Sequence, residues 1–283
     1  MVMSERATED KSLASEMGTV RSEIDCETTF SPSRSVSVQS AIVVPCYNES
    51  SRLRVDEFQR FLDADQLGCV LIFVDDGSRD QTAAVLESIR KRNKDRVVVL
   101  QQPVNRGKAE AVRSGMNYAF DQRFPFAGFW DADLATPLAA LPSFVDLLTV
   151  RPELDMIFGA RVRLLGRHVE RRASRHYMGR AFATAASLVL SLPIYDTQCG
   201  AKLFRCTPEM RTVFAEPFLS RWIFDIEIIA RYISVMKSPN EAARHIYELP
   251  LKSWVDVKGS KLGPHDFARA AYDLWRIGLK YRT

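Results

Sequence analysis

Two carboxylates, Asp131 and Asp133, follow directly on the apolar run 127–130 and have one small residue between them. Residues two apart in an extended chain point to the same side, so both carboxylates can face one point in space. Such hard oxygen ligands suit Mg²⁺ or Mn²⁺, which proteins often hold with one or two carboxylates and the phosphates of a substrate. Because Asp-x-Asp is also common in solvated turns, the surrounding elements must decide between a metal site and a turn.

Short apolar runs and amphipathic helical patterns alternate through the first half of the chain. The runs cover residues 41–45, 70–74, 96–100, 127–130 and 155–159, and later strands are expected at 201–205 and 245–251. Continuous apolar strands separated by helices are typical of an α/β fold, in which helices cover both faces of a parallel sheet.

Polar residues stand at the ends of three of these runs, at 47–49, 75–76 and 131–133. In open parallel sheets, ligands bind beyond the carboxyl ends of the strands. Three polar clusters at one sheet edge are much less expected by chance than one. The pattern therefore favours a ligand site with a metal ion over a simple turn.

Several helix starts are predicted from capping residues. Ser78 and Gln81 form a capping-box pattern that predicts a helix from 78 to about 92. Thr136-Pro137 and Thr207-Pro208 each match an N-cap followed by the first helical residue. The stretch 254–262 is expected to be a loop, and its residues 258–261 suit either a lid over a diphosphate or a solvated loop.

The composition is that of an ordinary globular protein with a mild excess of positive charge. Of 283 residues, 46% are apolar and 26% are charged, and the net charge is +4. This charge is too small for a general nucleic-acid binder, but it is compatible with an anionic small substrate or an acidic membrane surface. The five cysteines are odd in number and lack metal-finger spacing, which favours reduced thiols in a cytosolic protein.

Membrane and targeting signals are weak. No apolar run reaches the ~18 residues expected of a membrane span, and early acids argue against a signal peptide. Residues 1–38, rich in Ser, Thr, Glu and Arg, are expected to form a disordered or loosely attached tail. Seven arginines crowd into 161–180, and a helix from about 171 continues into the apolar stretch 181–192. This helix could contact a membrane peripherally through 171–194, or it could be core-packed with a solvated basic end.

Five motifs occur in an order that resembles a known family. They are Ile42-Val43-Val44-Pro45 with Tyr47-Asn48-Glu49, Val74-Asp75-Asp76-Gly77-Ser78, Asn105-Arg106-Gly107-Lys108, Asp131-Ala132-Asp133 and Asp196-Thr197-Gln198-Cys199-Gly200. The series is similar to the inverting family-two glycosyltransferases with a GT-A fold. Within that family it most resembles the branch of dolichyl-phosphate beta-glucosyltransferases and dolichol-phosphate mannose synthases, over about residues 41–265. The segments 196–200, 221–227 and 259–262 look most like the glucosyl members.

The resemblance implies a GT-A (Rossmann-like) architecture, which is a single α/β domain with a mixed, mainly parallel sheet flanked by helices. That domain would span 39–283, with a nucleotide-binding half at 39–135 and an acceptor-binding half at 136–283. The resemblance also implies a metal-dependent enzyme that takes a hexose from a nucleotide-diphosphate sugar. UDP-glucose is favoured over GDP-mannose through the glucosyl-like segments.

For the donor nucleoside, the resemblance places Pro45, Tyr47, Glu49 and Asp76 around the base and ribose. Carboxylates there can accept hydrogen bonds from a base N–H or a ribose hydroxyl. Asp75 could do the same or could simply cap the turn.

For the diphosphate, the resemblance implicates the loop before the third helix and the two carboxylates. Gly107 would permit close backbone approach, and Lys108 would offset phosphate charge, although a solvated first-turn lysine is the alternative. Asp131 would contact the ribose or a metal-bound water, and Asp133 would bind the metal directly.

The acceptor site depends on the nucleophile. A phosphate monoester is already anionic and needs positioning by arginine forks, for which Arg161, Arg171, Arg175 and Arg180 are the candidates. A hydroxyl acceptor instead needs a carboxylate base, and Asp196 is then the best candidate from its place in the family's acceptor loop. Residues 225 and 227 are weaker candidates for this base, and their alternative role is simply to anchor nearby arginines. The expected catalytic residues are Asp131, Arg161, Arg175 and Asp196.

The favoured function is hexose transfer to a polyprenyl or dolichyl phosphate, by a cytoplasmic protein that could lie peripherally on the membrane face. The alternatives are a soluble family-two transferase with a hydroxyl acceptor, and a nucleotide-sugar binding protein without catalysis, against which the intact carboxylates argue. A dehydrogenase is disfavoured because no Gly-x-Gly-x-x-Gly follows the first strand. A P-loop phosphotransferase is disfavoured because Asn-Arg-Gly-Lys lacks the rest of that loop.

Overall fold

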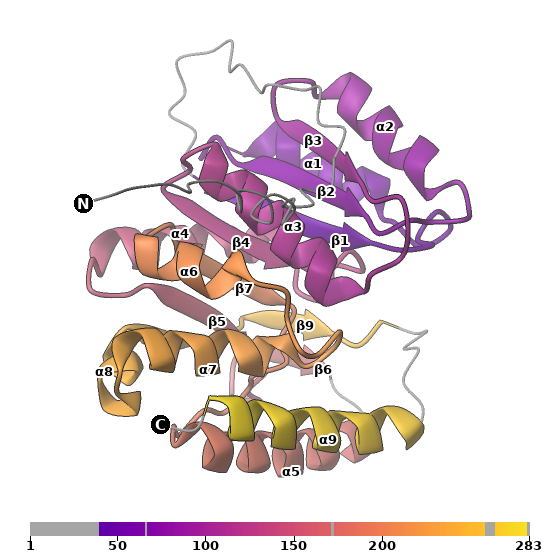
Figure 1. Cartoon of the computed structure of the whole chain (residues 1–283). Helices are drawn as coiled ribbons and strands as arrows, with labels where there is room; N and C mark the ends of the chain where they lie inside the picture. The colour runs from indigo at the N-terminus through magenta and orange to yellow at the C-terminus, as the bar shows by residue number, and fades with distance from the viewer. Residues whose placement is uncertain (1–39, 66, 171–172, 258–263, 282–283) are drawn as a thin grey trace, which may run out of the picture.

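The structure is a computed structural model that describes residues 40–65, 67–170, 173–257 and 264–281 (Figure 1). Within the helices, the side chains of 173–178 and 264–267 are not described. The expected tail at 1–38 and the expected lid residues 258–261 lie outside the described residues.

Within the described residues, the main sheet has seven strands in the order β3-β2-β1-β4-β7-β5-β8. Strand β7 runs antiparallel to both of its neighbours, and the remaining neighbouring pairs are parallel. This arrangement confirms the predicted mixed, mainly parallel sheet. The strands are β1 (Ser40–Cys46), β2 (Val70–Asp75), β3 (Val97–Gln101), β4 (Phe126–Trp130), β5 (Met156–Ala160), β7 (Ala201–Arg205) and β8 (Ile246–Pro250).

Helices cover both faces of this sheet, because the strands β1, β2, β4 and β5 are apolar along almost their whole length and nearly every residue in them is buried. One face packs against α1 (Val55–Ala64), α2 (Thr82–Arg92) and α4 (Leu141–Val150). The other packs against α3 (Lys108–Asp121), α6 (Pro208–Ala215) and α7 (Phe224–Met236), and α8 (Pro239–Arg244) follows α7.

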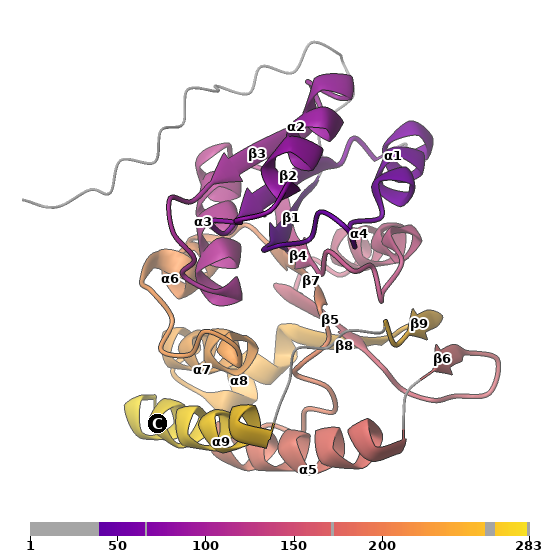
Figure 2. The same cartoon turned by 90° about the vertical axis from the view of Figure 1, so that its right-hand side faces the viewer.

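Two long helices, α5 (Ala173–Leu190) and α9 (Pro264–Lys280), form a further layer beyond α7. They lie side by side at the end of the molecule that is farthest from α2 and β3 (Figures 1 and 2). Among the described helices, none is long and apolar enough to cross a membrane.

The expected loop 254–262 is wrong in its first part. Residues Ser253–Val255 form strand β9, which pairs in parallel with β6 (His168–Glu170) as a separate two-stranded sheet. Trp254 is buried against the sheet face that α1 and α4 cover. A three-residue strand is too short to show the period-two pattern from which strands are recognised in sequence.

Two of the three helix starts predicted from capping residues are wrong. Helix α2 begins at Thr82, because the Ser78 hydroxyl accepts the Asn48 N–H at 3.0 Å instead of capping its own chain. After Thr136 the chain forms a 3₁₀ turn, η1 (Leu138–Ala140), and α4 begins only at Leu141. The start at Thr207 is confirmed, since its hydroxyl accepts the Met210 N–H at 3.2 Å.

The order of the strands decides where the polar clusters meet. The carboxyl ends of β2, β1 and β4 are adjacent, and the antiparallel β7 begins beside the end of β4. The segments 47–49, 75–76, 131–133 and 196–200 therefore gather at one edge of the sheet.

Candidate functional site

A cavity of about 710 Å³ opens at this edge of the sheet, within the size range of small-molecule sites. Its walls come from the ends of β1, β2 and β4, the start of α3, the loop before α7 and the first half of α9. The structure thus brings together every residue that the sequence assigned to the donor and the metal, apart from Asp75. These residues are Pro45, Tyr47, Glu49, Asp76, Gly107, Lys108, Asp131 and Asp133.

The segment directly before β7 holds Asp131 in this cavity. The Asp131 backbone N–H donates to the Gly200 carbonyl at 2.9 Å. Its Oδ1 lies 2.5 Å from the Lys108 Nζ, and both side chains are about one third exposed. A carboxylate and an ammonium therefore face each other where the donor phosphates are expected.

Lys108 is the first residue of α3, and the chain enters that helix through Gly107 at φ +97°. This positive φ is readily available only to glycine. Burial alone would lower the pKa of Lys108, but Asp131, Asp225 and Asp133 together outweigh it and raise the pKa above its ordinary value. The lysine is therefore a permanent cation at neutral pH.

Asp133 lies next to Asp131 in the same cavity and is mostly buried. Its Oδ1 accepts the Ala135 N–H at 3.1 Å. Burial, and then the neighbouring Asp131, raise the pKa of Asp133 above its ordinary value. A group in this situation gains from a nearby cation, because a cation stabilises its charged form.

The donor set fits a divalent cation in part. Within the described residues, no three Asp, Glu, His or Cys side chains come together as an ion-binding cluster. Asp131 and Asp133 thus offer hard oxygen ligands that the phosphate oxygens of a substrate would have to complete, which is how proteins commonly hold Mg²⁺. The ammonium of Lys108 already forms an ion pair with one of these carboxylates, Asp131.

Asp76 organises the loop before α3. Its two carboxylate oxygens accept the N–H groups of Arg106 at 2.7 Å and Gly107 at 2.8 Å. Burial raises the pKa of Asp76, and these two hydrogen bonds partly offset that rise. Asp75 accepts the Ser78 N–H at 3.0 Å, which is the turn-capping role that the sequence had left open for it.

Arg161 and Asp196 form a forked ion pair close to this cavity. Arg161 donates through Nε and Nη2 to the two oxygens of Asp196, each at 2.7 Å, and its backbone N–H adds a third bond at 3.0 Å. Both side chains are largely buried. Burial alone would lower the pKa of Arg161, but Asp196 and, less strongly, Asp131 raise it.

Glu248 fixes the loop that carries Asp196, and no motif in the sequence indicated this role. Its two oxygens accept the backbone N–H groups of Tyr195 at 2.8 Å and Asp196 at 2.7 Å. Burial raises the pKa of this carboxyl. Glu248 comes from β8, the last strand of the sheet, so only the sheet order brings it here.

The other predicted acceptor arginines are only partly described. Arg180 stacks over the Tyr195 ring at 3.9 Å and donates to the Tyr195 carbonyl at 3.1 Å. Arg171 lies outside the described residues, and so does the side chain of Arg175. Their roles stay predictions.

A second wall of the cavity was missed from sequence. Arg221 and Trp222 line it together with Asp273 of α9. Arg221 crosses to the opposite side, where its Nη2 donates to Asn105 Oδ1 at 2.5 Å. The Arg-Trp pair directly before an apolar helix can be recognised in the sequence. Its position in the cavity cannot be predicted from that pattern.

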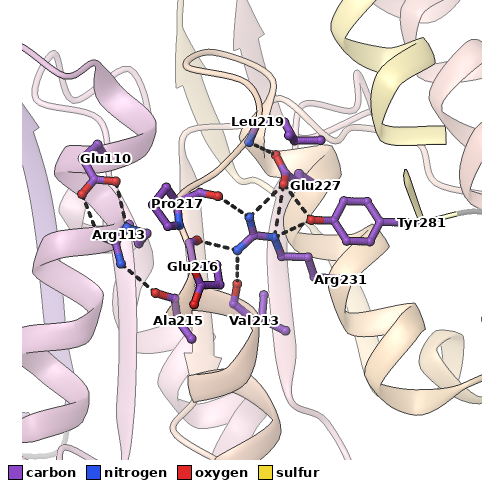
Figure 3. Close-up of polar contacts among 10 residues, drawn as sticks. All are labelled: Glu110, Arg113, Val213, Ala215, Glu216, Pro217, Leu219, Glu227, Arg231 and Tyr281. Atoms are coloured by element: carbon purple, nitrogen blue, oxygen red, sulfur yellow. Dashed lines mark hydrogen bonds and ion pairs between the residues drawn. The ribbon is translucent and has the colours of Figure 1, made fainter. Parts of the chain in front are cut away.

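The loop that carries Arg221 is anchored by Glu227 and Arg231 (Figure 3). Arg231 donates to Glu227 and to the carbonyls of residues 213, 216 and 217, and Glu227 accepts the Leu219 N–H at 2.7 Å. The Tyr281 hydroxyl also donates to Glu227, at 2.9 Å. Glu227 therefore anchors an arginine, as expected for it, while Asp225 pairs with Lys202 at 2.6 Å.

The comparison with known proteins assigns the family. A model described as glycosyl transferase family 2 matches residues 41–211, which is more than half of the chain. The chain belongs to glycosyl transferase family 2. The transferase is 32% identical over 261 residues to the dolichyl-phosphate beta-glucosyltransferase of Drosophila melanogaster, an alignment that covers 87% of this chain and 76% of that protein. The corresponding protein of Mus musculus is 33% identical over 260 residues, with the same coverage of both chains.

Solved structures confirm the fold of the transferase. It resembles glucosyl-3-phosphoglycerate synthase from Mycobacterium tuberculosis in complex with phosphoglyceric acid, with a TM-score of 0.61 at 17% identity over 87% of this chain and 80% of that one. The complex of that synthase with Mn²⁺, UDP and glucosyl-3-phosphoglycerate aligns with a TM-score of 0.60 at 17% identity, over 90% and 86% of the two chains.

Proposed function

We propose that this glycosyltransferase moves glucose from UDP-glucose to a polyprenyl phosphate of the dolichyl type, with a divalent cation held by Asp131 and Asp133. The observation that carries the proposal is the cavity in which adjacent carboxylates and the cation Lys108 face one space. Relatives named dolichyl-phosphate beta-glucosyltransferase support the sugar and the acceptor. A fold neighbour in complex with Mn²⁺ and UDP supports the cation and the nucleotide.

In this proposal each donor-side residue has one task. Asp131 and Asp133 would hold the divalent cation, which would supply Lewis-acid stabilisation of the leaving nucleotide. Lys108 offsets phosphate charge, and Arg221 lies across the cavity as a second cation. Asp76 holds the loop 105–107 in place, so that the N-terminus of α3 faces the phosphates.

The state of Asp196 favours a phosphate acceptor over a hydroxyl acceptor. A hydroxyl nucleophile needs a carboxylate that can take its proton. Both oxygens of Asp196 are already occupied by the Arg161 guanidinium, and the Gln198 N–H adds a further bond at 3.2 Å. A phosphate monoester needs no such base because it is anionic near neutral pH, and its attack from the face opposite the nucleotide would give the β-linked product.

The lipid acceptor agrees with an exposed apolar surface on the α5–α9 layer. This α5–α9 patch consists of Leu188, Val189, Trp275 and Leu279, of which Leu188 is 77% and Trp275 58% exposed. Lys280 and Arg276 of α9 lie beside these side chains in sequence and suit an anionic lipid surface. In the proposal the patch rests peripherally on a cytoplasmic membrane face.

The deciding experiment measures transfer by the purified protein from a panel that includes UDP-glucose and GDP-mannose, with Mg²⁺, Mn²⁺ or chelator. The acceptors are a short polyprenyl phosphate and the matching polyprenol. Transfer should require UDP-glucose, cation and the phosphate, and Asp133→Ala should reduce it by at least about 100-fold. Asp63→Ala, which removes an exposed carboxylate of α1, is the matched control and should keep full activity.

Each other outcome points elsewhere. Transfer to the polyprenol alone would favour the soluble, hydroxyl-accepting enzyme. Binding of UDP-glucose without transfer to any acceptor would favour a binding protein. Preference for GDP-mannose would change the donor and leave the acceptor chemistry intact.

Membrane contact has its own test. Leu188→Asp should abolish co-flotation with vesicles that contain anionic lipid and leave transfer to a short, water-soluble acceptor unchanged. Val150→Asp is the control, since Val150 is equally exposed, at 76%, at the end of α4. Equal flotation of both variants and of the parent protein would exclude the α5–α9 patch as the contact surface.

A further inference from the structure

The ion pair between Lys108 and Asp131 joins two groups that the proposed reaction needs separately. Asp131 is one of the two carboxylates that would hold the divalent cation, and Lys108 is the cation assigned to the diphosphate. In this structure their charged atoms lie 2.5 Å apart. An ammonium at that distance occupies one oxygen of Asp131, and it opposes a second positive charge at the same carboxylate.

The backbone of Lys108 is fixed, so that only its side chain can move. Its Cα is fixed as the first residue of α3, after the glycine at φ +97°. The side chain is about one third exposed, so its four-carbon stem retains freedom on the cavity side. The amino group also lies over the Phe224 ring, 5.9 Å from its centre. This cation–π contact is favourable and does not require one fixed position of the amino group.

A second carboxylate keeps the lysine in the site. Asp225, on the first turn of α7, directly follows Phe224, whose ring lies beneath the Lys108 amino group. Asp225 itself cannot follow the lysine, because it is buried and bound to the fully buried Lys202 at 2.6 Å. Lys108 can therefore leave Asp131 and still face a fixed negative charge on the side of α7.

We propose that Lys108 is an exchangeable counter-ion, which neutralises Asp131 while the cavity is empty and transfers to the donor diphosphate when a divalent cation takes Asp131. This inference rests on the proposed function, since it assumes that the cation and the nucleotide share this cavity. The exchange couples the two ligands: the cation alone must displace the lysine, whereas the diphosphate gives the displaced lysine a new partner. By linkage, the cation should then strengthen nucleotide binding by the same factor.

The test measures Mn²⁺ binding by the electron paramagnetic resonance signal of the free ion, at fixed pH and ionic strength, without turnover. Lys108→Met should bind Mn²⁺ about tenfold more tightly than the parent protein when no nucleotide is present. Lys108→Arg, which retains the charge, should bind like the parent. Lys94→Met removes one exposed lysine from the turn after α2 and controls for net charge.

Addition of UDP should cancel the advantage of Lys108→Met over the parent protein. In the parent protein UDP should tighten Mn²⁺ binding, whereas in Lys108→Met the tightening should be smaller by about tenfold, because the diphosphate has lost its lysine. A thermal melt of each variant confirms that it is folded. The loss of the tenfold difference on addition of UDP is a result that a merely structural role of Lys108 does not produce.

The possible results separate this inference from the proposed site. Mn²⁺ binding that Asp133→Ala removes, but that Lys108→Met leaves equal or weaker, overturns the counter-ion role and keeps the cation site. Absence of Mn²⁺ binding in the parent protein and in Lys108→Met overturns both. Tighter binding in Lys108→Met than in Lys108→Arg and Lys94→Met, followed by the loss of that difference with UDP, supports the exchange.

Discussion

Gly200 lies so close to Asp131 that a β-carbon at position 200 would stand 1.9 Å from Asp131 Oδ2. Real β-carbons do not approach other atoms so closely, and the obstacle here is the short side chain of the proposed metal ligand, whose backbone N–H is bound to the Gly200 carbonyl. Position 200 must therefore be glycine to leave space for Asp131, which directly follows β4. Two motifs separated by about seventy residues of sequence depend on each other through this contact.

Gly200→Ala should therefore remove activity and lower the free energy of unfolding by about 1–3 kcal/mol, because the added β-carbon needs space that Asp131 occupies. The added methyl group displaces the Asp131 carboxylate from Lys108, and we expect kcat/KM to fall by at least about 100-fold. Initial rates and a thermal melt would measure the two effects separately. Gly166→Ala is the control, because no atom of the described part of the chain lies within 4 Å of its β-position, and its φ of +76° should cost only about 1 kcal/mol of stability. Equal activity losses in the two variants would contradict this reasoning.

The buried pair of Lys202 and Asp225 should behave as one unit in unfolding experiments. Lys202 is fully buried between the rings of Phe129 and Phe158, each 5.3 Å from its Nζ. Lys202→Met leaves Asp225 as a buried, unpaired charge and should lower the free energy of unfolding by about 3–5 kcal/mol. The double variant Lys202→Met/Asp225→Leu should recover most of this loss. Urea unfolding of the full mutant cycle would measure the coupling, and additive single effects would show that the pair is not coupled.

Two arginines in Figure 3 provide a matched comparison. Arg231 is 7% exposed and bonds Glu227 as well as three backbone carbonyls, whereas Arg113 is partly exposed and bonds Glu110 and one carbonyl. Arg231→Met should cost about 3 kcal/mol or more, because it leaves Glu227 buried without its counter-ion. Arg113→Met should cost less than about 1 kcal/mol. Chemical denaturation of both variants gives the ranking, and a larger loss for Arg113→Met would refute it.

The Cys69 thiol should be unreactive in the native protein. Burial, and then the charge of Asp65, raise the pKa of Cys69 from 9.0 to about 12. Because its pKa is higher in the folded state, the thiol stays protonated to a higher pH when folded than when unfolded. The stability that Cys69 contributes is therefore lost as pH rises from about 9 to about 12. Iodoacetamide at pH 8 should label Cys69 only as fast as the protein unfolds, with urea-unfolded protein as the positive control. Rapid labelling in native buffer, read by peptide mass spectrometry, would argue against this burial.

Local pattern was sufficient for much of the fold and for part of the site. Strand-length apolar runs predict buried parallel strands because such strands meet helices on both faces, and the polar clusters after them predict the ligand edge. Asp76, Asp131 and Asp133 could be assigned to one edge on this basis, whereas Lys108 was assigned there through the family resemblance, and the structure places all four in one cavity. The start of α2 was mispredicted because the Ser78 hydroxyl bonds to Asn48, thirty residues earlier in the chain.

The residue types at the strand ends follow from local sequence, because hydrophobic periodicity and strand termination are local properties of the chain. The pairing of their charges, in contrast, depends on how the elements pack in three dimensions. Lys108 meets Asp131, Arg161 meets Asp196, and Glu248 reaches the loop 195–196 from the far edge of the sheet. These partners lie between 23 and 53 residues apart, and they meet because β7 enters the sheet antiparallel between β4 and β5 and because α3 starts beside β4. Ion pairs at such separations depend on where the packed elements place each charge, which no local pattern of residues encodes.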